Sequence, residues 1–343
     1  MKELTVKDKL FFFEKHFFTL DGLWMIEMEK KTDWNIALDL DLKVWLKLLK
    51  IIFKRLKKYL NIQSNDIIDL VEILTFRWSV EGWKYDIMKM DSNEVYISVK
   101  GCPYKSAMDR NPERHDKRAL ICNNMCKPFY HEIVKEFNPS ISLKRNKFMG
   151  LKDDDECDFR LSMTQNQKID KEKLKQRVLQ QKIRDKDKLF YFERNFRTLD
   201  GLWVIETENE IDFKTALELD IVVWQRLYSI IFRRVMKYLK IEGNTLDDLI
   251  SILSFVWNCE GNLHEIIRYN NEEVQLNITV CPYIDAMKRN PDRHHRIVSI
   301  CKDMCVPYLD PVIKEFNKNI KIQRSQFMGL GDNICDFHLT LKE

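Results

Sequence analysis

The stretch CPYKSAMDRNPERHDKRALICNNMC, from Cys102 to Cys126, recurs later in the chain as CPYIDAMKRNPDRHHRIVSICKDMC, from Cys281 to Cys305. The two stretches are identical at 14 of 25 positions and align without a gap. Two copies of such length indicate that a whole domain was duplicated, because solenoids stack many shorter repeats. The same fold is therefore expected twice in this chain.

The duplication extends well beyond the cysteine stretch. TLDGLWMIEMEK at Thr19 matches TLDGLWVIETEN at Thr198, an offset of 179 residues that holds as far as Gly150 and Gly329. We predict repeat 1 over residues 1–163, a helical connector over 164–184 and repeat 2 over 185–343. The connector is charged, contains no Gly or Pro and is rich in helix-forming residues.

Each repeat combines helical and strand patterns. Residues 34–60 carry apolar side chains at three- and four-residue steps, which predicts a long amphipathic helix, and residues 8–30 predict another with a break near Asp21–Gly22. EVYISVKGCP and EVQLNITVCP alternate apolar and polar residues, as antiparallel strands do. The expected fold is α+β, with two tandem repeats that each pack a helical bundle segment on a small antiparallel sheet.

The overall composition excludes several classes of protein. A net charge of +4 over 343 residues is too small for a nucleic-acid-binding surface. No apolar run approaches the length of a transmembrane helix, and the first residues lack the pattern of a signal peptide. We therefore predict a cytoplasmic protein that binds neither nucleic acid nor membrane, in which thiols stay reduced.

Cysteines are the strongest chemical signal in the sequence. Eight of the nine cysteines match between the repeats, while Cys259 aligns with Val80 and is expected to be a buried small hydrophobic residue. Cysteines spaced by four on a helix share one face, and four thiolates suit the tetrahedral shell of Zn²⁺. The predicted metal ligands are Cys102, Cys122, Cys126 and Cys157 in repeat 1 and Cys281, Cys301, Cys305 and Cys335 in repeat 2.

This pattern predicts two zinc ions per chain. Zinc is favoured over an iron–sulfur cluster because the compact C-x2-C-x2-C run of many clusters is absent. A closed shell of four cysteines has no vacant position for water and is therefore structural. Catalysis would require water or substrate in place of one cysteine, with His115 or His294 as the nearest matched alternative ligand, but a solvated role is favoured for these histidines. Unliganded core cysteines, redox chemistry and an iron–sulfur cluster remain as alternatives.

Other residues that match between the repeats are candidates for ligand binding or catalysis. Matched acids such as Glu27 and Glu206 are expected to be caps or solvated helix residues, and no common enzyme motif is present, so no catalytic residue is assigned. Most matched aromatic residues are expected in the core. The candidate ligand-binding residues are Trp24, Trp203, Tyr104, Tyr283, Arg110 and Arg289.

The segments FFTLDGLWMIEMEK, IALDLDLKVW, GCPY, ICNNMC and CDF resemble an uncharacterised archaeal and bacterial family. That family is similar to the L-2-amino-thiazoline-4-carboxylic acid hydrolase-like proteins and, more distantly, to the four-vinyl-reductase ligand-binding domain. The resemblance implies an α+β domain with a cavity for a small ligand. In phenol-sensing relatives a zinc site of cysteines and one acidic residue lies near that cavity. Cys102, Cys126 and Cys157 would then occupy the cysteine positions, and Cys122 would stand where the acidic ligand falls.

These observations favour a metal-binding protein that binds or senses a small molecule. The alternatives are a hydrolase of a small cyclic amidine or thiazoline carboxylic acid, and an iron–sulfur protein; enzymatic activity is left open. Because the duplication preserves any surface that a dimeric ancestor used, we predict that the two repeats pair as a pseudo-dimer within one chain.

Overall fold

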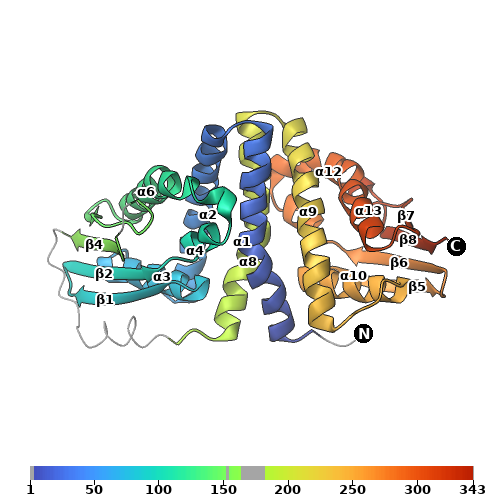
Figure 1. Ribbon diagram of the computed structural model, residues 1–343, viewed down its shortest axis with the longest axis horizontal. Helices are drawn as coiled ribbons and strands as arrows, with labels where there is room; N and C mark the ends of the chain where they lie inside the picture. Colours follow the sequence, from blue (N-terminus) through green and yellow to red (C-terminus); the bar gives the residue numbers. More distant parts are fainter. Residues whose placement is uncertain (1–3, 152–153, 164–181, 343) are drawn as a thin grey trace. The chain divides into compact units, whose positions relative to one another are not determined.

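The computed structural model describes residues 4–151, 154–163 and 182–342 (Figure 1). The chain forms two compact units: unit 1 comprises Met1–Lys31 and Trp203–Glu343, and unit 2 comprises Thr32–Leu202. Among the described helices, none is long and apolar enough to cross a membrane. The predicted connector falls mainly on residues 164–181, which lie outside the described part of the chain.

Unit 2 is built from the body of repeat 1 together with the beginning of α8 (Asp185–Glu210). Its other helical elements are α2 (Trp34–Tyr59), α3 (Ile67–Glu81), α4 (Pro103–Asp109), η1 (Pro112–Arg114), α5 (Lys117–Leu120), η2 (Ile121–Cys126) and α6 (Lys127–Phe137). Its strands are β1 (Lys84–Met90), β2 (Glu94–Gly101), β3 (Ile141–Lys144) and β4 (Cys157–Met163).

Unit 1 is built from α1 (Val6–Lys31), the end of α8 and the body of repeat 2. Its other helical elements are α9 (Phe213–Leu239), α10 (Leu246–Glu260), α11 (Pro282–Lys288), η3 (Pro291–Arg296), α12 (Ile297–Asp303), α13 (Cys305–Phe316) and η4 (Met328–Leu330). Its strands are β5 (Leu263–Tyr269), β6 (Glu273–Val280), β7 (Ile320–Gln323) and β8 (Cys335–Leu341).

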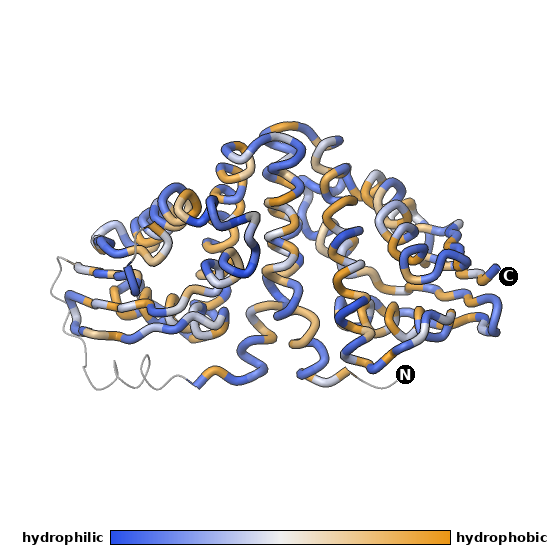
Figure 2. The backbone as a smooth tube through the Cα atoms, in the orientation of Figure 1, coloured by the Kyte–Doolittle hydropathy of each residue, from blue (hydrophilic) through white to orange (hydrophobic). Residues whose placement is uncertain are grey.

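Each unit contains one four-stranded antiparallel sheet, with strand order β1-β2-β4-β3 in unit 2 and β5-β6-β8-β7 in unit 1. The inward residues of the central strands are apolar, for example Ile97 opposite Phe159 and Leu276 opposite Phe337. Hydrophobic and hydrophilic segments alternate along the long helices (Figure 2). The predicted fold class, α+β in two similar halves, is confirmed.

The helix ends follow local sequence signals. Asp33 and Asp66 cap α2 and α3 by accepting hydrogen bonds from the first backbone N–H groups, and Thr245 and Asp248 form a capping box at α10. Gly82 ends α3 with a φ of 85°, a left-handed conformation that glycine adopts without steric cost. The chain can then turn directly into β1.

The first helix of repeat 1, α1, lies in the compact unit of repeat 2, and the beginning of α8, the first helix of repeat 2, lies in the compact unit of repeat 1. In unit 1, the Phe11 ring on α1 stacks on Tyr238 of α9 at 4.0 Å, and the Tyr238 hydroxyl donates to Asp8 at 2.7 Å. In unit 2, Phe190 on α8 stacks in the same way on Tyr59 of α2. The compact units therefore do not coincide with the sequence repeats, although the predicted boundaries of the repeats and their pseudo-dimeric pairing stay predictions.

One expectation about the helices is wrong. The predicted break near Asp21–Gly22 is absent, because α1 runs without interruption from Val6 to Lys31. Pro128 lies in the first turn of α6, a position that proline tolerates, and the helix continues past it to Phe137. At Gly22 the low helix propensity of one residue is too small to override the packing of a long helix.

Candidate functional site

The four cysteines of repeat 1 come from three separate pieces of unit 2. Cys102 follows β2 and caps α4, and Cys157 is the first residue of β4. Cys122 and Cys126 both lie in η2, a π-helical turn, a conformation often found at functional sites. The expectation that one helical segment carries this pair is therefore confirmed in outline, with a π-helix in place of an α-helix.

These pieces bring the four thiols into one neighbourhood. A methyl group added at Gly150 would lie only 2.2 Å from the Cys122 Sγ, so the chain and this thiol are in close contact. The backbone N–H of the preceding residue, Met149, donates to the Cys157 Sγ at 3.3 Å. Cys102 and Cys122 each interact electrostatically with Cys126 and Cys157. All four thiols are free.

The second quartet in unit 1 repeats this arrangement with one local difference. Cys281 follows β6, Cys301 lies in α12, Cys305 begins α13 and Cys335 begins β8. The helix is interrupted at Met304, between Cys301 and Cys305, where unit 2 has the π-helical turn. Cys301 interacts electrostatically with the other three cysteines. The duplicated spacing therefore gives two duplicated clusters.

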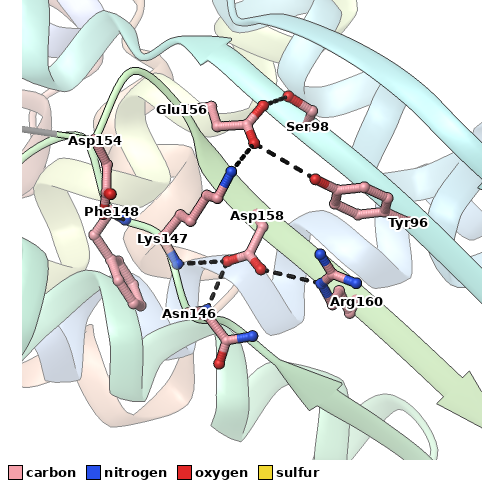
Figure 3. Close-up of polar contacts among 9 residues, drawn as sticks. All are labelled: Tyr96, Ser98, Asn146, Lys147, Phe148, Asp154, Glu156, Asp158 and Arg160. Carbon is pink, nitrogen blue, oxygen red and sulfur yellow. Dashed lines mark hydrogen bonds and ion pairs between the residues drawn. The ribbon is translucent and has the colours of Figure 1, made fainter.

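Acidic side chains fold the loop between β3 and β4 that reaches the first cluster (Figure 3). The fully buried Asp158 accepts hydrogen bonds from the backbone N–H groups of Asn146 (2.6 Å) and Lys147 (2.8 Å). Asp154 accepts one from the N–H of Phe148 at 3.0 Å. In unit 1, Asp336 and Asp332 bind the corresponding loop in the same way. The acids beside the last cysteine therefore position the loop.

An arginine accompanies each cluster, buried in unit 2 and half-buried in unit 1. Arg145 is 8% exposed, and its Nη1 donates to the Cys126 Sγ at 3.4 Å. Its guanidinium carbon lies 4.0 Å from the centre of the Phe159 ring and 4.4 Å from that of Phe148. Within the described residues Arg145 forms no ion pair with a carboxylate. Buried charges are normally paired, so this cation lacks an ordinary partner.

Arg324 occupies the corresponding place in unit 1. Its guanidinium packs 4.2 Å from the ring centres of Phe327 and Phe337 and interacts electrostatically with Cys305. Its Nη1 is buried and makes no hydrogen bond in the part of the chain that the structure describes. Neither arginine is among the residues predicted for the site, although both repeats carry one at the start of the matching segments RNKFMG and RSQFMG.

The electrostatics of the thiols follow from burial. Burial raises the pKa of Cys102 and of Cys122 to about 12, and the neighbouring thiols add to this shift. Burial likewise raises the pKa of Cys281 to about 12. Thiols in such surroundings stay protonated unless a cation binds them.

The donor set suits a soft metal ion, but the side chains do not form a ligand shell. Four thiols with N–H donors directed at sulfur are the groups that bind zinc or iron–sulfur clusters in proteins. However, among the described residues no group of three or more His, Cys, Asp or Glu side chains is arranged to hold a metal ion. The predicted ligands are therefore neighbours, but they do not surround a common position at which a metal ion would be coordinated.

The candidate ligand-binding residues do not meet at one place. Trp24 and Trp203 stack on each other at 5.7 Å within unit 1 and are fully buried, and Arg110 and Arg289 are exposed at the ends of α4 and α11. Tyr104 instead packs beside the core of unit 2, edge-on to the Trp45 ring at 5.8 Å.

A buried ion pair lies in that core. The Arg77 Nε donates to Glu81 at 2.8 Å, and the carboxylate also accepts hydrogen bonds from Trp83 at 2.9 Å and from Tyr191 of α8. Both side chains of the pair are at most 2% exposed. In unit 1 the Arg77 position is occupied by Val256.

In unit 1 two tyrosine hydroxyls hold the corresponding acid. Glu260 accepts hydrogen bonds from Tyr228 at 3.1 Å and from Tyr283, one of the candidate ligand-binding residues, at 3.3 Å. Glu81 and Glu260 are a further pair of matched acids, for which the sequence predicts solvated positions on a helix, and the structure corrects this by burying both. Glu27 and Glu206, expected to be caps or solvated residues, are also buried, and Glu27 of α1 pairs with Lys30 and with Arg226 of α9.

Residues 3–144 and 173–306 both match the model of DUF6125, a family of unknown function. The chain belongs to this family. The two matched segments confirm that the protein contains two copies of a domain from an uncharacterised family. No curated protein and no solved structure matches the chain. The relationship to thiazoline hydrolases and four-vinyl reductases stays a prediction.

Proposed function

We propose that this member of the DUF6125 family is a metal-binding protein in which each cysteine quartet holds one structural zinc ion. The observation that carries the proposal is an arginine beside four thiols in both units, buried in unit 2 and half-buried in unit 1. Arg145 contacts Cys126 and aromatic rings, and in the described residues no carboxylate balances its charge. Metal-bound thiolates would supply the missing negative charge.

The charges support this assignment. Four thiolates around Zn²⁺ carry two net negative charges, and burying such a group is costly unless cations and N–H donors surround it. Arg145 and the backbone N–H groups of Lys105 and Met149 provide such donors in unit 2. When bound, the metal would cross-link strand ends, helix and loop; Cys102, Cys122, Cys126 and Cys157 would hold it in unit 2, and their counterparts in unit 1.

A closed four-cysteine shell offers no open position for a substrate or water, so the metal would stabilise the fold and not catalyse a reaction. This favours a protein that binds or senses a small molecule over a hydrolase. Glu27 on α1, an acid that a hydrolase could use, is engaged with Lys30 of the same helix and with Arg226 of α9, and it belongs to neither cysteine cluster.

Metal analysis of the full chain tests the proposal. Protein purified without oxygen or chelators should contain about two zinc ions per chain. The double variants Cys122→Ser/Cys126→Ser and Cys301→Ser/Cys305→Ser should each lose about one. Cys259→Ser is the matched control, because this buried cysteine belongs to neither quartet, and it should retain both ions.

Two results would contradict the assignment. A folded protein that contains no metal after anaerobic purification would exclude metal binding as the role of the quartets. A protein that absorbs visible light and contains iron and sulfide would replace zinc by an iron–sulfur cluster, since zinc thiolates are colourless.

A further inference from the structure

The edge strand of the sheet in unit 1 exposes an unusual number of apolar side chains. On β5, the side chains of Leu263, Ile266, Ile267 and Tyr269 are 58%, 43%, 53% and 53% exposed. The strand stands at the end of the order β5-β6-β8-β7, so its outer hydrogen-bonding groups have no neighbouring strand in that sheet. Exposed apolar edges pair readily with other strands.

The equivalent edge of unit 2 is protected. On β1, Lys84 occupies the position of Leu263, and a lysine on an edge strand opposes pairing with a second chain. The β1 acid, Asp86, forms an ion pair with Lys100 on the neighbouring strand. In unit 1 the position of Lys100 is Thr279, which offers no charge.

As a consequence, one acid on β5 lacks an ion partner. Glu265 corresponds to Asp86, is exposed, and forms no ion pair in the described part of the chain. Arg268, three residues later, pairs with Glu273 at 3.2 Å but keeps a side chain that is 62% exposed. The edge therefore presents one negative and one positive group among apolar neighbours.

A β-bulge places these two charges on the same face. Ile266 lies opposite Leu276 of β6, and Arg268 lies opposite the next residue, Gln275, so that Ile267 is the extra residue of the bulge. Glu265 lies opposite Asn277. Because Asn277 and Gln275 are two positions apart on β6, Glu265 and Arg268 point to one side of the sheet.

We propose that β5 is the interface of a homodimer, in which the β5 strands of two chains pair antiparallel about a two-fold axis. If Ile266 faces Ile267 of the second copy, Glu265 faces Arg268 of that copy, and the symmetry creates this ion pair twice. Because this two-fold axis is perpendicular to the sheet, side chains on one face of the sheet in the first chain lie on the same face in the second chain. Glu265 of each chain therefore meets Arg268 of the other. The charge pattern of β5 is thus complementary to itself.

This pairing closes after two chains. The protected β1 edge does not offer a second attachment point, so the contact gives a dimer and not a fibre. The proposal is independent of metal binding, because none of these residues belongs to a cysteine quartet.

Mass measurement on the full chain tests the interface. Light scattering during size-exclusion chromatography should give twice the chain mass of 41.4 kDa at micromolar or higher concentration. Leu263→Lys, which introduces the residue present on β1, should give a monomer. The matched control Met88→Lys changes the exposed bulge residue of β1 and should leave the dimer intact.

A charge exchange separates pairing from general stickiness. Glu265→Arg places two arginines opposite each other in both halves of the interface and should weaken dimerisation about tenfold, since like charges directly opposite are destabilising. The double exchange Glu265→Arg/Arg268→Glu should restore it in part. The proposal would be overturned if the natural protein remained monomeric at concentrations on the order of 100 µM, or if Leu263→Lys left the dimer unchanged. Circular dichroism confirms that each variant is folded.

Discussion

Replacing His16 by asparagine should remove a large part of the acid sensitivity of unit 1. His16 lies on α1, is 0% exposed, and packs edge-on against the Phe12 ring at 5.1 Å. In the described residues, neither ring nitrogen has a hydrogen-bond partner of normal geometry. Burial lowers the pKa of His16 to about 3, the Arg234 guanidinium adds to this effect, and the nearby Phe12 carbonyl opposes it in part.

The size of the effect follows from proton linkage. The pKa of this histidine is about 6.5 in the unfolded chain, so between pH 6.5 and pH 3 the unfolded state binds a proton that the folded state excludes. The contribution of the neutral His16 side chain to the free energy of unfolding is therefore fully present at neutral pH, and it falls as the pH decreases through this window. From pH 7 to pH 4 the loss amounts to about 3 kcal/mol, since one pKa unit corresponds to about 1.36 kcal/mol.

Asparagine is the matched replacement because Asn195 occupies the corresponding position of α8. There the Asn195 side chain accepts from Arg55 at 2.6 Å and donates to the Tyr191 carbonyl oxygen at 2.7 Å. An asparagine at the position of His16 has Arg234, the counterpart of Arg55, within the same unit. We therefore expect His16→Asn to fold normally at pH 7.

Urea unfolding of both proteins between pH 7 and pH 4, followed by tryptophan fluorescence, measures the effect. Carboxylates titrate in both proteins, so the difference between their pH profiles isolates His16. The free energy of unfolding should fall by about 3 kcal/mol more in the natural protein than in His16→Asn. Equal pH profiles would show that the histidine is solvated or protonated in the folded state and would refute the argument.

Two further substitutions test the packing. Arg77→Met should destabilise unit 2 by about 3–5 kcal/mol in urea unfolding, because it leaves the buried Glu81 carboxylate without its cation, and adding Glu81→Gln should recover part of the loss. Gly329→Ala should lower the free energy of unfolding by about 1–3 kcal/mol, because the new methyl group would lie 2.7 Å from the Cys301 Cβ. It should also lower the zinc content by about one ion per chain. Gly201→Ala on α8 is the control, because an added methyl group there would have no other atom within 4 Å, and it should raise the free energy of unfolding by about 0.5–1 kcal/mol. Equal effects of the two alanine substitutions would contradict the predicted clash at Gly329.

Sequence alone determined the duplication, the α+β class and the matched cysteines. These features depend on local patterns: apolar residues at helical spacing in residues 34–60, alternation in EVYISVKG and its counterpart, and a constant offset of 179 residues. Such patterns survive because a helix or strand must bury one face wherever it packs. The same reasoning could not recognise the buried acids Glu81 and Glu260, because a carboxylate in a helix looks solvated until its partners are known.

Only the tertiary structure decided which helix belongs to which unit. Asp8 and Phe11 on α1 match Asp187 and Phe190 on α8, so either helix offers the same anchors, and the sequence cannot choose between the two sites that receive them. The approach of Arg145 to Cys126 was equally hidden. The contact between Arg145 and Cys126 depends on a loop that is held by hydrogen bonds between acidic side chains and the loop backbone. Contacts between residues far apart in the chain produce no periodic sequence pattern from which they could be predicted.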